Sequence, residues 1–91
     1  MAELACTVRI RGRVQGVFFR QWTSEQATEL GVAGWVRNLS DGSVQAHVEG
    51  QQADVEQLID RMRRGPSHAR VDELTLGDAM PEGLGDFRIC P

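Results

Sequence analysis

The sequence contains no lysine and no tyrosine, and it has only two cysteines and three prolines among its 91 residues. Without lysine the chain cannot form a Walker phosphate loop, because that motif requires one. The two cysteines, Cys6 and Cys90, stand at opposite ends with no CxxC spacing. Clustered cysteine and histidine ligands for zinc are absent as well. We therefore expect an activity that uses neither a metal nor a cofactor.

Long apolar runs are also missing. No stretch approaches the roughly 18 apolar residues that a membrane-spanning helix needs. The start of the chain, residues 1–6, has no basic region followed by a long apolar stretch, so no secretory signal is visible. These absences predict a cytoplasmic protein without a membrane partner. In a reducing compartment unpaired thiols are the default, so we favour free cysteines over a Cys6–Cys90 disulfide.

The composition describes one small globular domain, residues 1–91. Hydrophobic residues make up 41% and charged residues 25% of the chain, and the formal net charge is −3. Residues 1–20 nevertheless hold four arginines against a single glutamate. An acidic chain has no general surface for duplex nucleic acid, so we expect no nucleic-acid partner. The local positive region near its start suits a small anion instead.

Hydrophobic periodicity divides the chain into seven elements. Residues 6–14 alternate between apolar and polar, as a strand with one buried face does. In residues 54–64 the apolar positions recur with helical spacing. The predicted elements are a strand at 6–14, a helix at 21–30, strands at 34–39 and 43–49, a helix at 54–64, and strands at 71–76 and 86–90. This β-α-β-β-α-β order with a short terminal strand predicts an α+β fold, the ferredoxin-like α/β plait, with two helices on one face of a mainly antiparallel sheet.

One turn combines three features that suit an anion. Residues 12–20 connect the first strand to the first helix, contain Gly12 and Gly16, and end in Arg20. A helix N-terminus offers unpaired N–H groups and the positive end of a dipole. The arginine adds a planar fork that matches two phosphate oxygens. On spacing alone a purely structural role for the glycines remains the alternative, since glycines are common in strand–helix turns.

The identity of the residues is more specific than their spacing. Residues 12–20 read G-R-V-Q-G-V-F-F-R, which resembles the signature G-x-V-Q-G-V-x-[FY]-R of the acylphosphatase family. Residues 34–44, G-W-V-R-N-L-S-D-G-S-V, resemble the second signature of that family. The stretches 65–71 and 87–89 match as well, and the resemblance extends over about residues 5–90.

The resemblance implies a small stand-alone enzyme that hydrolyses acyl phosphates to a carboxylate and inorganic phosphate. It assigns catalysis to Arg20 and Asn38, with the Asn38 amide orienting the attacking water. The implied substrate-binding residues, through their backbone N–H groups, are Gln15, Gly16, Val17, Phe18, Phe19 and Arg20. An acyl phosphate already carries a good leaving group, so screening of phosphoryl charge and placement of a water are the main requirements. The implied partners are the acyl phosphate and inorganic phosphate.

Three other functions agree with parts of the sequence. A non-catalytic module of the same fold that binds phosphate or another anion is the main alternative, although such a module would not need Asn38. An RNA-binding plait is disfavoured, because the strands at 6–14 and 43–49 contain no aromatic residue and the pI is near 5.3. A domain of a larger enzyme that handles carbamoyl phosphate is the third, but the chain ends directly after its last strand, which favours the stand-alone enzyme. No long apolar patch is evident on the open sheet face, so we expect a monomer.

Several conspicuous side chains receive ordinary structural interpretations. We expect His47, on the open sheet face, and His68, in a loop, to be surface residues without a catalytic role. Trp22 and Trp35 are expected to pack in or at the edge of the core. The arginines of the first strand are expected to be solvated on the open face.

Overall fold

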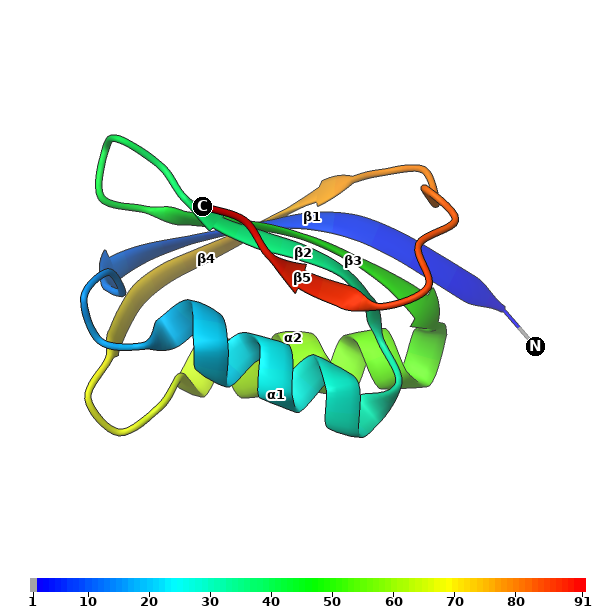
Figure 1. The fold of residues 1–91 in the computed structure, drawn as a ribbon, viewed down its shortest axis with the longest axis horizontal. Helices are drawn as coiled ribbons and strands as arrows, with labels where there is room; N and C mark the ends of the chain where they lie inside the picture. Colours follow the sequence, from blue (N-terminus) through cyan, green and yellow to red (C-terminus); the bar gives the residue numbers. More distant parts are fainter. Residues whose placement is uncertain (1) are drawn as a thin grey trace.

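A computed structural model describes residues 2–91 and forms a five-stranded sheet with two helices. The elements are β1 (Glu3–Arg13), α1 (Phe19–Leu30), β2 (Ala33–Asn38), β3 (Val44–Gln51), α2 (Gln52–Arg64), β4 (Arg70–Asp78) and β5 (Phe87–Ile89). The strands lie in the order β4-β1-β3-β2-β5, and only the β2–β5 pair is parallel. Both helices pack on one face of the sheet (Figure 1), as the predicted α/β plait requires.

The core lies between the helices and the inner face of the sheet. In β1 the alternation predicted from the sequence places Val8 and Ile10 inward, where both are completely buried. Helix α2 contributes Val55, Leu58 and Met62 at helical spacing, and these are completely buried too. Each such side chain stabilises the fold by about 1.5–3 kcal/mol relative to an exposed one.

Helix α1 begins two residues earlier than the sequence pattern predicted. It starts at Phe19 rather than Gln21, so Arg20 belongs to the first helical turn. The residue before the helix, Phe18, has a left-handed backbone with φ of 62°. At the other end Gly31 takes φ of 72° and its N–H donates to carbonyls of the last turn, as predicted for a glycine that ends a helix. The earlier start matters because it fixes Arg20 to a rigid element.

The connection from β4 to β5 crosses the outer face of the sheet. These strands form opposite edges, and the helices occupy the inner face. The Glu49 carboxylate on β3 accepts hydrogen bonds from the backbone N–H groups of Glu82, Gly83 and Leu84 at 2.8, 3.1 and 3.2 Å. His47, beside Glu49, is consequently only 2% exposed. The prediction that His47 is a surface residue is therefore wrong, because the crossing segment covers it.

The two tryptophans pack on different faces of the sheet. Trp22 is partly buried against the core and lies 5.7 Å from the Phe19 ring between centroids, as predicted. Trp35 instead lies on the outer face, stacked on His47 with 6.0 Å between ring centroids, and its indole N–H donates to Glu82. The prediction for Trp35 is thus corrected: it packs beneath the crossing segment and not in the core. His68, in contrast, is exposed as predicted.

Both cysteines are free, as expected from the sequence. Cys6 is buried in β1, and its burial, together with the nearby charge of Asp78, raises the pKa of its thiol. Cys90 follows β5 and is half-buried. Within residues 2–91 neither helix has the length and hydropathy needed to cross a membrane.

Candidate active site

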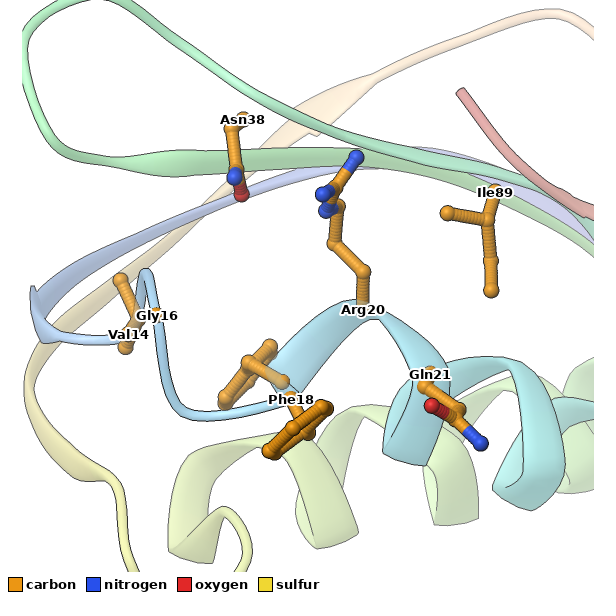
Figure 2. Close-up of a pocket in the computed structure, with 8 residues that line it drawn as sticks. Val14, Gly16, Phe18, Arg20, Gln21, Asn38 and Ile89 are labelled. Atoms are coloured by element: carbon orange, nitrogen blue, oxygen red, sulfur yellow. The ribbon is translucent and has the colours of Figure 1, made fainter. Parts of the chain in front are cut away.

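A single cavity brings the two predicted catalytic residues together. It has a volume of about 350 Å³ and lies between the turn that precedes α1, the end of β2 and β5. Figure 2 shows its lining residues. They are Val14, Gly16, Phe18, Phe19, Arg20, Gln21, Asn38 and Ile89. The cavity therefore contains an arginine, an amide and a helix N-terminus, which is the chemistry that a phosphate ester or anhydride requires.

Arg20 projects from the first turn of α1 toward the sheet, between Asn38 and Ile89 (Figure 2). Its Nη1 donates a hydrogen bond of 2.6 Å to the backbone carbonyl of Cys90. This bond holds the guanidinium against the end of β5, and it is the only hydrogen bond of the Arg20 side chain to the residues that the structure describes. The remaining donors of the fork can therefore serve a bound anion.

Asn38 is the last residue of β2, and its side chain points into the cavity (Figure 2). Its amide oxygen Oδ1 is buried and accepts no hydrogen bond from residues 2–91. Burying such an acceptor without a partner costs about 1–3 kcal/mol, so it strongly favours a hydrogen-bond donor from a water or a substrate. The geometry therefore offers a fixed acceptor beside the Arg20 cation.

The backbone of the turn before α1 alternates between left-handed and ordinary conformations. Gly16 has φ of 74° and Phe18 has φ of 62°. For a residue with a side chain this conformation costs about 1–2 kcal/mol. Backbone that turns in this way can point successive N–H groups into one concavity, which is how proteins form anion-binding nests. Phe18 keeps this conformation although its ring is 80% exposed and gains little from burial.

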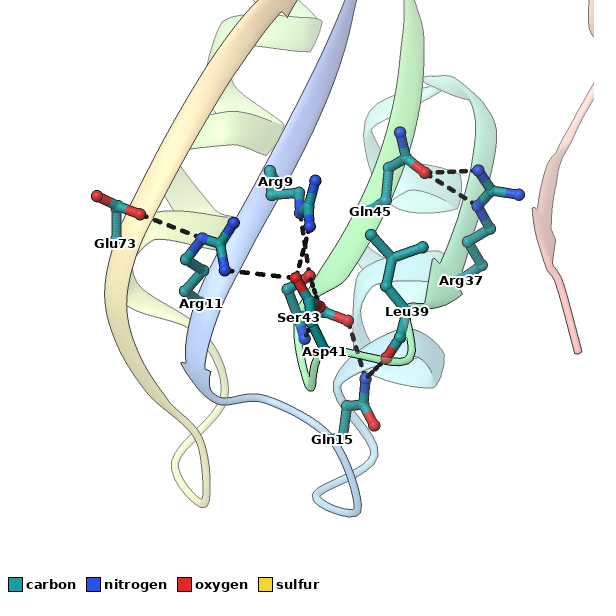
Figure 3. A network of polar contacts seen from close by, with 9 residues as sticks. All are labelled: Arg9, Arg11, Gln15, Arg37, Leu39, Asp41, Ser43, Gln45 and Glu73. Atoms are coloured by element: carbon teal, nitrogen blue, oxygen red, sulfur yellow. Dashed lines mark hydrogen bonds and ion pairs between the residues drawn. The ribbon is translucent and has the colours of Figure 1, made fainter.

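Two of the six residues predicted to bind substrate do not line the cavity. Val17 packs against the core, partly buried. The side chain of Gln15 turns toward the β2–β3 hairpin, where its Nε2 donates to the carbonyls of Leu39 and Ser43 at 2.8 and 2.9 Å (Figure 3). The other four, Gly16, Phe18, Phe19 and Arg20, do line the cavity.

Sequence reasoning did not anticipate the contribution of β5. Ile89 lines the cavity and the Cys90 carbonyl holds Arg20. Strand β5 reaches this position because it pairs in parallel with β2, with Val36 opposite Ile89. The sequence predicted a short strand at residues 86–90, but no pattern in one sequence gives the partner of that strand.

Two arginines of β1, Arg9 and Arg11, are paired on the outer face of the sheet. Arg9 donates to the Asp41 carboxylate at 2.6 Å and to the Ser43 hydroxyl at 3.0 Å, and Arg11 lies 3.4 Å from Asp41 (Figure 3). Hydrogen bonds from Ser43, and then from Arg9, hold the pKa of Asp41 well below its usual range. Asp41 therefore stays ionised and neutralises part of the positive charge expected from the sequence.

Comparison with known proteins identifies the family. Residues 6–89 match the acylphosphatase family model. The chain belongs to the acylphosphatase family. It is 50% identical over 86 residues to an acylphosphatase of Rhizobium etli, covering 93% of this chain and 92% of the relative. It is 47% identical over 89 residues to an acylphosphatase of Thermococcus kodakarensis, covering 98% of each. Acyl phosphate hydrolysis, implied by the motifs, is thereby confirmed as the activity of the family.

Solved structures agree in fold. The crystal structure of acylphosphatase from Bacillus subtilis superposes with a TM-score of 0.93 at 29% identity, covering 97% of this chain and 99% of that one. Full-length HypF in its phosphate- and nucleotide-bound form contains a similar unit, with a TM-score of 0.87 and 27% identity. That unit is 12% of the HypF chain, so the acylphosphatase fold also occurs within a longer protein. These likenesses confirm the predicted ferredoxin-like plait.

Proposed function

We propose that this chain hydrolyses acyl phosphates with Arg20 and the backbone of residues 15–20 holding the phosphoryl group and Asn38 placing the attacking water. One observation carries the assignment of residues: Arg20 from α1 and Asn38 from β2, whose amide oxygen is buried and unpartnered among residues 2–91, line the same cavity at a helix N-terminus. Membership of the acylphosphatase family supports the substrate class.

The proposed reaction is a direct displacement at phosphorus. A water oxygen bonds to phosphorus while the bond from phosphorus to the acyl oxygen breaks, and the carboxylate leaves with the bonding electron pair. One proton of the water passes to a phosphoryl oxygen of the substrate, so no protein base is required. The leaving group is already stable as an anion, and the barrier is lowered mainly by positioning and charge stabilisation.

Each part of the site has a distinct task in this scheme. The Arg20 fork and the N–H groups at the start of α1 stabilise the charge on the phosphoryl oxygens. The Asn38 Oδ1 accepts a hydrogen bond from the water and so directs a lone pair of the water oxygen toward phosphorus. The Cys90 carbonyl keeps the guanidinium in place.

A hydrolysis assay with excess chelator tests the proposal. We expect the purified chain to hydrolyse benzoyl phosphate at the same rate with and without chelator, and to act poorly on phosphate monoesters. A monoester needs a general acid to protonate its poor leaving group, and the cavity lining offers none. Loss of turnover on chelation, or comparable cleavage of monoesters, would overturn the mechanism. Binding of inorganic phosphate without any turnover would favour the non-catalytic anion-binding module.

The proposal extends to the working form of the protein. We expect residues 1–91 to act as one domain, as a monomer in the cytoplasm, on small molecules and without a nucleic-acid partner. The small cavity supports small-molecule substrates, and the pairing of Arg9 and Arg11 with Asp41 supports the absence of a nucleic-acid partner. Size-exclusion chromatography with light scattering measures the oligomeric state, and cell fractionation measures the location.

A further inference from the structure

We propose that the side chain of Gln15 is a positioning residue, which ties the phosphate-binding turn to the hairpin that carries Asn38. This inference rests on the proposed function. In this role the Gln15 carboxamide does not bind phosphate. It sets the distance between the bound phosphoryl group and the attacking water. The β2–β3 hairpin comprises residues 38–44.

The contacts of Gln15 satisfy both hydrogens of its amide nitrogen. Nε2 donates to the Leu39 carbonyl at 2.8 Å and to the Ser43 carbonyl at 2.9 Å. These are the two ends of the hairpin turn, since the Leu39 N–H donates to the Ser43 carbonyl at 2.8 Å. Gln15 therefore bridges both sides of the turn that immediately follows Asn38 (Figure 3). Asn38 itself pairs with Val44 of β3, so the two bonds set the place of residue 15 relative to Asn38.

The opposite side of the hairpin is fixed to β1. Arg9 donates to the Ser43 hydroxyl at 3.0 Å and to Asp41 at 2.6 Å, and the Ser43 backbone N–H donates to Asp41 at 2.9 Å. The hairpin is thus held between Arg9 from one side and Gln15 from the other (Figure 3). Arg9 anchors it to the sheet, whereas Gln15 anchors it to the turn before α1.

Among residues 2–91, the side chains of residues 15–20 make two hydrogen bonds to the hairpin, and Gln15 donates both of them. Helix α1 and the Cys90 carbonyl hold Arg20 independently of it. Removing the carboxamide should therefore leave Arg20 in place but loosen the turn at residue 15 relative to Asn38, which the pairing of β2 with β3 holds. A misplacement of about 1 Å is enough to lower a rate about 10²-fold.

The Gln15→Met variant tests this role while keeping the length of the side chain. Methionine fills similar space but donates no hydrogen bond. We expect kcat for benzoyl phosphate to fall about 10- to 100-fold, while the inhibition constant of inorganic phosphate changes less than about three-fold. Gln45→Met is the matched control: Gln45 lies on the outer face of β3 and accepts from Arg37. It should retain the wild-type kcat.

A double-mutant cycle separates positioning from general stabilisation. If Gln15 acts through Asn38, adding Gln15→Met to Asn38→Ala should lower kcat less than about two-fold further. Equal losses in the wild-type and Asn38→Ala backgrounds would overturn the inference, as would an unchanged kcat in a folded Gln15→Met. If Gln15→Met does not fold, Gln15→Lys and Gln15→Glu take its place. Lysine can donate hydrogen bonds to the two carbonyls and glutamate cannot, so the inference requires Gln15→Lys to have the higher kcat. An inactive wild-type chain would refute the proposed function itself.

Discussion

Arg20 joins a permanent charge, a planar fork and a fixed place in the first turn of α1. In the proposed mechanism the charge attracts a phosphoryl group in both the ground state and the transition state, and the fork matches two of its oxygens. The Cys90 carbonyl takes one donor of the fork and sets its orientation. The contribution of Arg20 therefore depends on shape as well as charge.

Replacing Arg20 by glutamine should weaken phosphate binding and turnover together. Loss of one preorganised donor costs about 10²–10³ in rate, and a charged fork should reach or exceed that loss. Arg20→Lys should recover little, because an ammonium cannot reproduce the fork. Steady-state kinetics with benzoyl phosphate and inhibition by inorganic phosphate measure both effects. A lysine variant with nearly full turnover would show that charge alone suffices.

Asn38 should affect catalysis without affecting affinity. Its neutral amide adds little attraction for an anion, but its buried oxygen can hold a water in line. Asn38→Ala should lower kcat by about 10²–10³-fold and leave the phosphate inhibition constant nearly unchanged. Asn38→Asp should be slower still, because its carboxylate repels the phosphoryl oxygens. Circular dichroism checks the fold of both variants, and near-normal kcat in a folded Asn38→Ala would remove Asn38 from the mechanism.

Phe18 carries backbone strain that a glycine would relieve. Its φ of 62° is left-handed, a region that glycine occupies at no steric cost. The Phe18→Gly variant should therefore be more stable than Phe18→Ala by about 1 kcal/mol, since both lack the ring and differ only in the Cβ atom. Urea denaturation of the two variants measures this difference. Greater stability of the alanine variant would show that the left-handed backbone at residue 18 does not destabilise the folded protein.

At the scale of elements, the segment that crosses the outer face is held by a carboxylate. Glu49 accepts three backbone hydrogen bonds from it and lies 2.6 Å from the His47 ring nitrogen Nε2. Burial raises the pKa of Glu49, but the hydrogen bonds from Glu82, His47 and Leu84 outweigh burial and lower the pKa overall. The crossing segment therefore depends on Glu49 being ionised.

This dependence predicts how stability changes with pH. A group whose pKa is lower in the folded state stabilises the fold above its unfolded pKa, about 4.3 for glutamate, and loses that effect as the pH falls through its folded pKa. Glu49→Gln should be about 1–3 kcal/mol less stable than wild type at pH 7. The difference should shrink below about pH 4.3. Denaturation curves across pH measure it, and a difference independent of pH would exclude this role of ionised Glu49.

At the scale of the whole molecule, the site exists only where three distant segments meet. The turn before α1, the end of β2 and the residue after β5 converge at one end of the plait. The proposed phosphate site exists only in the folded chain, so the proposed mechanism links phosphate binding to folding.

Inorganic phosphate should therefore raise the melting temperature of the wild-type protein. At a concentration about 100 times its dissociation constant it stabilises the folded state by about 2.7 kcal/mol. The Arg20→Gln variant should gain much less at the same concentration, because it lacks the charged fork. Differential scanning calorimetry with phosphate, against sulfate-free buffer of equal ionic strength, measures the shift. Equal shifts in both proteins would place the anion site elsewhere.

Much of the fold could be predicted because each element carries its own periodicity. The alternation in β1 and the helical spacing of Val55, Leu58 and Met62 are local patterns, and the structure confirms both. The start of α1 was harder to predict from the sequence, since Phe18 and Phe19 gave no capping signal. Gly31, in contrast, marked the end of α1 correctly, because glycine favours the left-handed backbone found there.

The sequence by itself determined the type of fold and the family, because these depend on local periodicity and residue identity, and it predicted Arg20 and Asn38 as the residues of the site. Only the tertiary structure decided which segments meet. It placed the Cys90 carbonyl on Arg20, turned Gln15 toward the hairpin and buried His47. These outcomes follow from strand order, and strand order is set by packing of the whole chain. A single sequence shows which face of each element is apolar and must be buried, but it does not show which other element packs against that face.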